Sequence, residues 1–147
     1  MTKHVVTWEG ARRFTGSTPE GRESRFDIPV DKGGEGSAPS PMEVVLHAHA
    51  ACGALDVVAI LEKMRCPPES VRVEIEAERA ENHPRVFTAI RLRYVVSGDV
   101  PEKKLARAIE LSSRTFCSVG AMLGATAEIS HAYVLESRDR RSDRPIR

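Results

Sequence analysis

The stretch that decides the fold is APSPMEVVLHAHAACGALDVVAILEKMR, residues 38–65. Its start carries a helix-initiation signal. The Ser40 oxygen can accept an orphan backbone N–H, and Pro41 suits the first helical position because it has no N–H to lose. Glu43 completes a capping-box pattern with Ser40. The sequence therefore predicts a helix that begins at Pro41.

The middle of this helix is apolar nearly all round, from Val44 to Leu61. Such a helix must be covered on most sides, and a chain of 147 residues has little material to wrap it completely. We therefore expect a homodimer in which a second subunit covers part of the helix. We expect the helix to end near Arg65, because Pro67 and Pro68 cannot continue its hydrogen bonds.

Composition and charge argue against several classes of function. Lys and Arg number 22 against 21 Asp and Glu, so a net charge of +1 creates no field that favours nucleic acid or an anionic membrane. Asp56 lies within the apolar helix, and a charge at mid-bilayer costs roughly 2.5–3.5 kcal/mol, so we expect no membrane span. MTKHVVTWEG at the start has no apolar run of signal-peptide length. Three widely spaced cysteines favour a reducing cytoplasm over a disulfide scaffold or a zinc site.

On the N-terminal side of the helix, β-like segments at residues 5–8, 13–15 and 24–29 predict a small antiparallel meander. The next stretch, DKGGEGSAPS at residues 31–40, is rich in glycine and serine and has no periodicity. It predicts a flexible loop.

On the C-terminal side, two runs that alternate apolar and charged residues predict an antiparallel hairpin with cross-strand charge pairs. Pro101 predicts a helix to about Arg114, and a short apolar helix and a last strand should follow it. The tail at residues 138–147 is charged. We expect a single α+β domain over residues 1–147. The expected ranges of these elements are 71–78 and 90–96 for the hairpin strands, 118–123 for the short helix and 129–135 for the last strand.

Two of the three cysteines are candidates for redox chemistry. Cys52 lies in mid-helix, and the glycine at position 53 costs about 1 kcal/mol relative to alanine there, so we expect another group to approach the backbone beside the sulfur. Cys117 should lie where a short helix begins, and the free N–H groups of a helix start lower the pKa of a thiol. Cys66, beside Pro67, should be an incidental surface thiol. The ordinary alternative for Cys52 and Cys117 is a packing role in the core.

The histidines of the central helix suggest two further hypotheses. His47 and His49 diverge by about 200° around a helix, so they cannot chelate one ion, and we expect no metal or other cofactor. His49 and Asp56 fall on the same side as Cys52, which leaves open a hydrolytic Cys-His-Asp site. On an apolar helix such groups more often satisfy one another or a neighbouring subunit.

Three segments together resemble the OsmC/Ohr family: residues 38–65, VEIEAERAENHPRVFTAIRLRYVVSG at 73–98, and LSSRTFCSV at 111–119. The resemblance covers nearly the whole chain to about Leu135, and the PME at residues 41–43 is similar to a separate branch of the family. The resemblance implies an intertwined homodimer with two long central helices between extended sheets, and two active sites at the subunit interface.

The resemblance also implies an activity, because characterised members reduce organic hydroperoxides. Cys52 resembles the peroxidatic thiol, which becomes a sulfenic acid, and Cys117 resembles the resolving thiol, which closes a disulfide. A dithiol reductant of the lipoyl type would then reopen that bond. The alternative is a family member without peroxidase activity that binds a small apolar ligand at the dimer cleft or protects under stress.

The resemblance further implies groups that hold the thiolate: a glutamate ten positions before the first cysteine and an arginine from the N-terminal strands. Met42 occupies the glutamate position here. Glu43 stands nine positions before Cys52, roughly 180° away from it on a regular helix, so it is a candidate for the site, for a helix cap or for the partner's site. Arg12 and Arg13 are both candidates for the arginine, which would favour the charged form of the thiol.

Overall fold

The computed structural model describes residues 1–136. The chain forms two compact units, residues 1–46 and residues from His47 onwards, and helix α1 (Pro41–Lys63) runs through the boundary between them. The predicted α+β fold class is confirmed. The single domain over residues 1–147 stays a prediction, and the charged tail at residues 138–147 lies outside the described residues.

The first unit contains the predicted antiparallel meander. Strands β1 (Val5–Trp8), β2 (Phe14–Ser17) and β3 (Glu23–Phe26) pair in the order β1-β2-β3. A single 3-10 turn, η1 (Val30–Lys32), follows them. The meander and its order along the chain are therefore as the turn-rich spacing predicted.

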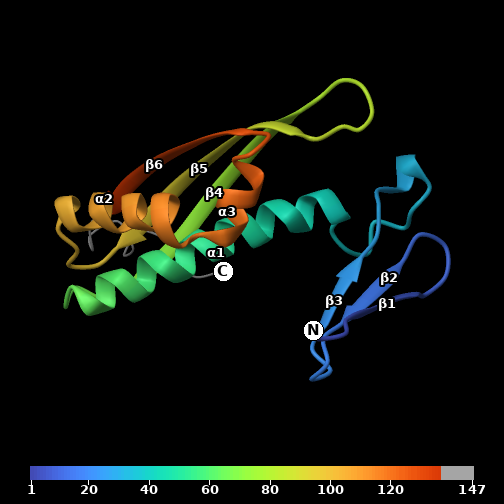
Figure 1. The fold of residues 1–147 in the computed structure, drawn as a ribbon, viewed down its shortest axis with the longest axis horizontal. Coiled ribbons are helices and arrows are strands. Elements are labelled where there is room, and N and C mark those ends of the chain that lie inside the picture. Colours follow the sequence, from blue (N-terminus) through green and yellow to red (C-terminus); the bar gives the residue numbers. More distant parts are fainter. Residues whose placement is uncertain (137–147) are drawn as a thin grey trace, which may run out of the picture. The chain divides into compact units, whose positions relative to one another are not determined.

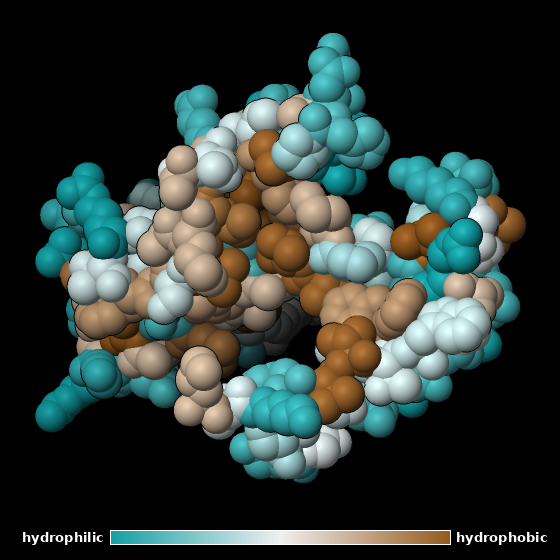
Figure 2. Space-filling view, turned by 45° about the vertical axis from the view of Figure 1, so that its right-hand side comes forward, coloured by the Kyte–Doolittle hydropathy of each residue, from teal (hydrophilic) through white to brown (hydrophobic). Residues whose placement is uncertain are grey.

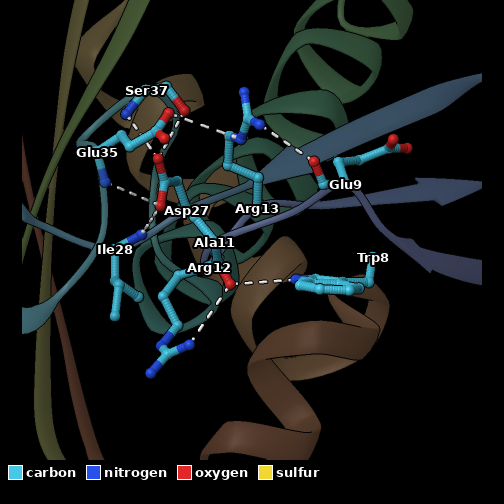
Figure 3. A network of polar contacts seen from close by, with 9 residues as sticks. All are labelled: Trp8, Glu9, Ala11, Arg12, Arg13, Asp27, Ile28, Glu35 and Ser37. Atoms are coloured by element: carbon cyan, nitrogen blue, oxygen red, sulfur yellow. Dashed lines mark hydrogen bonds and ion pairs between the residues drawn. The ribbon is translucent and has the colours of Figure 1, made fainter.

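One buried carboxylate, that of Asp27, organises the glycine-rich stretch after β3. It accepts the N–H groups of Ile28 at 2.7 Å and Glu35 at 3.4 Å, and both the N–H and the hydroxyl of Ser37, at 3.0 and 2.6 Å (Figure 3). These bonds, above all those from Ser37, lower the pKa of Asp27 to about 2. We call these four residues the Asp27 cluster. Glu35 and Ser37 of the loop predicted at residues 31–40 are thus hydrogen-bonded to Asp27, which the composition of the loop did not indicate.

Helix α1 begins with the predicted capping box. The backbone N–H of Ser40 donates to the Glu43 carboxylate at 2.7 Å, and the N–H of Glu43 donates to the Ser40 hydroxyl at 3.3 Å. Two orphan donors at the helix start are satisfied in this way. Glu43 therefore serves as a helix cap, one of the roles considered for it.

The end of α1 corrects the prediction for Cys66. The helix stops at Lys63, Arg65 adopts a left-handed conformation with φ 60°, and the Cys66 N–H donates to the Leu61 carbonyl at 3.0 Å. This is the Schellman arrangement, which folds the chain back against the last turn. Cys66 is consequently buried beside the equally buried Leu61, and the expectation of a surface thiol was wrong.

Only one stripe of α1 is covered within the described chain. Its buried residues recur every fourth position (His49, Gly53, Val57 and Leu61), whereas Leu55 on another face is 72% exposed. Figure 2 shows hydrophobic residues at the surface of the face in view. By length and a mean hydropathy of 1.9 α1 could cross a membrane, a test that the core helix of a soluble protein also passes. The uncovered apolar surface is consistent with the homodimer, which stays a prediction.

The second unit contains the predicted hairpin. Strands β4 (Ser70–Arg79) and β5 (Phe87–Ser97) pair antiparallel through ten residue pairs. Glu74 and Arg93 lie opposite one another and form an exposed ion pair at 2.7 Å. The expected cross-strand charge pairing is therefore present on the outer face, where such pairs add little stability.

The last strand, β6 (Glu128–Glu136), lies parallel to β5. Parallel neighbours need a crossover connection, and the chain provides it through α2 (Glu102–Leu111), a π-helical turn η2 (Ser112–Phe116) and α3 (Ser118–Leu123). In Figure 1 these helices and the sheet are labelled within the second unit. The crossover brings the start of α3 back towards the sheet.

The core of this unit lies between the inner face of the sheet and the helices. The inner face of β5 is aliphatic except for one buried tyrosine, Tyr94, which is 1% exposed. α1 and α2 contribute further buried apolar side chains. The main buried side chains are Val57, Leu61, Ile90, Leu92, Tyr94, Val96, Leu105, Ala108 and Ile109.

Candidate active site

The structure brings the thiols of Cys52 and Cys117 close together. Cys52 is half-buried on α1, Cys117 is buried at the start of α3, and Cys52 lies near enough to raise the pKa of Cys117. Both are free thiols. Sixty-five positions separate them in the sequence, so only the crossover between β5 and β6 brings them together.

A π-helical turn delivers Cys117 to this position. The helix predicted to reach Arg114 instead ends as an α-helix at Leu111, and the next five residues form η2. The Cys117 N–H donates to the Ser112 carbonyl, five residues earlier, at 2.8 Å. A wider turn of this kind changes the direction in which the following residue points, and such turns are frequent at functional sites.

The pKa of Cys117 moves in the direction opposite to the prediction. Cys117 does cap the start of α3, and its sulfur accepts the Gly120 N–H at 3.3 Å. Burial, however, is the largest of the causes that together raise the pKa of Cys117 to about 11, and the neighbouring Cys52 and Asp56 act in the same direction. The expected lowering was wrong, because a helix of six residues does not offset this loss of water. Cys117 is a protonated thiol at neutral pH.

A hydrogen bond between Ser112 and Asp56 lies beside the two thiols. The Ser112 hydroxyl is 2.9 Å from Asp56 Oδ2 and 3.5 Å from the Gly53 carbonyl. Asp56 follows Cys52 by one helical turn, so both lie on the same side of α1. We call Cys52, Asp56, Ser112 and Cys117 the thiol site.

Gly53 permits the close packing beside Cys52. A Cβ at position 53 would collide with the Tyr94 hydroxyl and would lie 3.8 Å from the Ser112 hydroxyl. The expected close approach to the helix backbone is thus confirmed. Burial is the main cause that raises the pKa of Tyr94 to about 12, and the charges of Cys117, Asp56 and Cys52 contribute to the rise. The Tyr94 hydroxyl therefore lies beside the thiol site.

A cavity of about 470 Å³ adjoins Cys117. His49, 2% exposed, lies in its wall, and its Nδ1 has no hydrogen-bond partner within residues 1–136. His131 also lines the cavity and stacks on Tyr94 with ring centroids 6.4 Å apart. Burial lowers the pKa of both histidines, and the neighbouring His131 lowers that of His49 further. Both imidazoles are therefore neutral at neutral pH, each with one donor and one acceptor nitrogen.

The arrangement does not support a hydrolytic Cys-His-Asp site. In such a site Asp56 would orient the His49 imidazole. Asp56 instead accepts the Ser112 hydroxyl, and His49 Nδ1 has no partner in the described part of the chain. Residues 1–136 also contain no cluster of three or more His, Cys, Asp or Glu side chains that could hold a metal ion.

The other predicted site residues lie in the first unit. Arg13 donates to the Glu9 carbonyl at 3.1 Å and forms an ion pair with Glu35 at 3.6 Å, and Arg12 reaches the Ala11 carbonyl at 3.5 Å (Figure 3). Glu43 takes part in the capping box. An activating role of Arg12, Arg13 or Glu43 towards Cys52 stays a prediction.

Sequence reasoning missed four residues of the thiol site and the adjoining cavity: Tyr94, Ser112, Gly120 and His131. Two of them carried a usable signal. Tyr94 falls on the apolar face of its strand and Ser112 on the apolar face of its helix, and a polar group on a buried face needs a partner. Gly120, whose Cβ would lie 3.1 Å from His49 Nε2 and 3.2 Å from the Cys117 sulfur, had no such signal.

Comparisons with known proteins agree with this architecture. The family model of the OsmC-like proteins matches residues 34–132. Protein YhfA of Escherichia coli strain K12 is 40% identical over 129 residues, which cover 87% of this chain and 93% of YhfA. A hypothetical protein from Aquifex aeolicus VF5 has a similar structure, with a TM-score of 0.82 and 27% identity over 94% of this chain and 98% of that one.

More distant solved structures share the fold. An organic hydroperoxide resistance protein OsmC from Legionella pneumophila superposes with a TM-score of 0.69 at 16% identity, covering 90% of this chain and 96% of that one. Fold, matched residues and the YhfA relationship agree, and this chain belongs to the OsmC-like protein family.

Proposed function

We propose that this protein is a thiol-dependent peroxidase that reduces organic hydroperoxides through Cys52 and Cys117. The observation that carries the proposal is the proximity of the two thiols, whose segments are joined by the hydrogen bond from Ser112 to Asp56 at 2.9 Å. Structural neighbours described as organic hydroperoxide resistance proteins support the same chemistry.

The reaction needs two thiols in different roles. The Cys52 thiolate attacks the terminal peroxide oxygen, the O–O bond breaks, and the alcohol leaves with a proton while Cys52 becomes a sulfenic acid. The Cys117 sulfur then attacks the Cys52 sulfur, a disulfide forms, and the hydroxyl leaves as water with the Cys117 proton. The hydroperoxide gains two electrons and the two thiols lose them.

The environment of Cys117 suits the second role. Because its pKa is raised to about 11, it is a poor first nucleophile at neutral pH. Its proximity to Cys52 supports the resolving role, because a sulfenic acid on Cys52 would form beside it. The organic group of the hydroperoxide would lie in the cavity beside Cys117, whose wall includes neutral imidazoles and serine hydroxyls as well as alanine and isoleucine.

Four further elements belong to the proposal. Arg12 or Arg13 would stabilise the Cys52 thiolate, and Glu43 is a further candidate residue of the site. A homodimer would cover the exposed face of α1, and a dithiol reductant of the lipoyl type would reopen the disulfide. We also place this chemistry in the cytoplasm, where a reducing pool keeps the thiols free.

The test is a single turnover with cumene hydroperoxide. One equivalent is added to the reduced protein and to the Cys52→Ser, Cys117→Ser and Cys66→Ser variants, free thiols are counted, and disulfides are mapped by mass spectrometry. The wild type and Cys66→Ser should each lose two thiols and gain a Cys52–Cys117 bond. Cys117→Ser should stop at a trappable sulfenic acid, and Cys52→Ser should not react.

Survival of all three thiols in the wild type would refute the peroxidase proposal. The alternative, a non-peroxidase OsmC-like protein that binds a small apolar ligand or protects under stress, would then be preferred. If the disulfide forms, dihydrolipoamide and glutathione are compared as reductants. Faster reduction by dihydrolipoamide would support the dithiol part of the proposal.

The dimer is tested separately by Leu55→Asp. Leu55 is 72% exposed on α1 in the single chain. If this face is a subunit interface, the charge should shift the sedimentation coefficient from dimer to monomer, because a buried unpaired carboxylate is costly. Glu62→Gln, a substitution at another exposed position of α1, is the control. A wild type that sediments as a monomer contradicts the dimer.

A further inference from the structure

The thiol site is closed by four links. Cys52 and Asp56 lie one turn apart on α1, and Ser112 and Cys117 are joined through η2 by the bond from the Cys117 N–H to the Ser112 carbonyl at 2.8 Å. Two links between the segments join residues of the thiol site: the proximity of the two thiols and the hydrogen bond from Ser112 to Asp56 at 2.9 Å. The Ser112 hydroxyl also reaches the Gly53 carbonyl of α1, at 3.5 Å. The bond from Ser112 to Asp56 involves neither sulfur atom.

We propose that the Ser112–Asp56 hydrogen bond is a positioning clamp that holds Cys117 against Cys52 and thereby favours their disulfide. Ser112 acts through Cys117 because its hydroxyl binds α1 while its carbonyl holds the Cys117 backbone. It is a positioning residue, whose described hydrogen bonds go to α1 and to the Cys117 backbone. The inference rests on the proposed pairing of the two thiols but does not depend on peroxide as the oxidant.

Burial and composition support this assignment. Ser112 is 1% exposed, and a serine hydroxyl in the core needs a partner, which alanine would not. Its hydroxyl reaches both Asp56 and the Gly53 carbonyl, so the polar group is used entirely for contact with α1. The adjacent Ser113 differs, because its hydroxyl is exposed and donates to the Glu110 carbonyl within its own segment at 3.1 Å.

The bond to the Asp56 carboxylate also restricts the position of η2 relative to α1. Hydrogen bonds that involve an ionised group are shorter and roughly twice as strong as neutral ones. Without the Ser112–Asp56 bond, the only links described above that would remain between η2 and α1 are the longer contact of the Ser112 hydroxyl with the Gly53 carbonyl and the proximity of the thiols. The local concentration of Cys117 at Cys52 should therefore fall when either clamp residue loses its polar group.

The experiment measures the effective concentration of the two thiols in a glutathione redox buffer. Glutathione disulfide oxidises Cys52 and Cys117 to their disulfide and is reduced to two glutathione molecules, so atoms and electrons balance. The equilibrium constant is obtained by acid quenching and mass spectrometry. The protein carries Cys66→Ser throughout, so that the two remaining thiols are the pair under test.

Ser112→Ala and Asp56→Ala should each lower the equilibrium constant about tenfold, the effect of one lost hydrogen bond to a charged group. The double variant should fall no further than Ser112→Ala alone, because the serine exchange already removes the contact with Asp56. Asp56→Asn retains an oxygen acceptor and should stay within about twofold of the parent. Ser113→Ala is the matched control and should leave the constant unchanged.

Three results would overturn the clamp: an unchanged constant in Ser112→Ala, fully additive losses in the double variant, or an equal loss in Ser113→Ala. Absence of a Cys52–Cys117 disulfide at any glutathione ratio would overturn it as well. The outcome is separate from the peroxidase proposal. A protein that ignores cumene hydroperoxide but shows the Ser112→Ala loss would keep the clamp and refute the peroxidase.

Discussion

The Asp27 cluster and the thiol site both contain buried polar groups, but these groups differ in their hydrogen bonding and in the direction of their pKa shifts. Asp27 receives four hydrogen bonds and its pKa is lowered to about 2, so its charge is fully satisfied. In the thiol site burial raises the pKa of Cys117 to about 11, and the nearby His49 Nδ1 has no partner in the described chain. A saturated buried group holds structure, whereas unsatisfied groups beside a cavity are available for chemistry.

The largest expected effect that tests this comparison is the raised pKa of Cys117. Iodoacetamide labelling of Cys117 in the Cys66→Ser protein should be slow at about pH 7 and should rise until about pH 11. The rate at neutral pH should be about four orders of magnitude below the plateau, since only the thiolate reacts. Peptide mass spectrometry separates Cys117 from Cys52, and free glutathione serves as the control. A plateau near pH 8 would mean that the thiol is not desolvated.

A second prediction concerns the tight packing at Gly53. The helix backbone beside the thiol site has no room for an added side-chain carbon. Gly53→Ala should destabilise the fold by about 2 kcal/mol, because the collision with the Tyr94 hydroxyl outweighs the gain in helix propensity. Urea unfolding provides the measurement. In a Tyr94→Phe background the same exchange should cost much less, since the added Cβ then makes only ordinary contacts, with the ring at 3.5 Å and the Ser112 hydroxyl at 3.8 Å. Equal costs in both backgrounds would contradict the collision.

Acid titration tests whether the Asp27 cluster is structural. The folded pKa of about 2 lies below the ordinary 3.8, so the stability contributed by Asp27 is full above about pH 4 and is lost as pH falls through about 2. Asp27→Asn should therefore lower the urea midpoint at about pH 7, and the difference from the wild type should shrink towards pH 2. Asp31→Asn, on the exposed η1 turn, is the control. A pH-independent difference would argue that shape, and not charge, matters at this position.

The smallest expected effect concerns His49. Burial, and secondarily the charge of His131, lowers its pKa from 6.5, so the unfolded chain binds more protons below that pH. Stability should therefore decrease as pH falls below about 6.5, and His49→Gln should flatten this decrease. His83→Gln, in the exposed hairpin loop, should leave the slope unchanged. NMR titration of the His49 ring checks the cause directly: a midpoint above 6.5 would contradict it.

The sequence by itself determined most of the secondary structure of this protein. Helix α1, its capping box, the meander, the hairpin and the short helix α3 follow from local patterns, because apolar periodicity, proline and capping residues act over a few positions. The same patterns singled out Cys52, Cys117 and the close approach at Gly53. The resemblance to the OsmC/Ohr family rested on these segments and is confirmed by the family match.

Only the tertiary structure decided which groups meet. The proximity of Cys52 and Cys117, the bond from Ser112 to Asp56 and the position of Tyr94 join segments far apart in the chain. Sequence also misjudged Cys66 and the pKa of Cys117. Burial and desolvation depend on what the whole fold packs around a side chain, and local spacing carries no record of that environment.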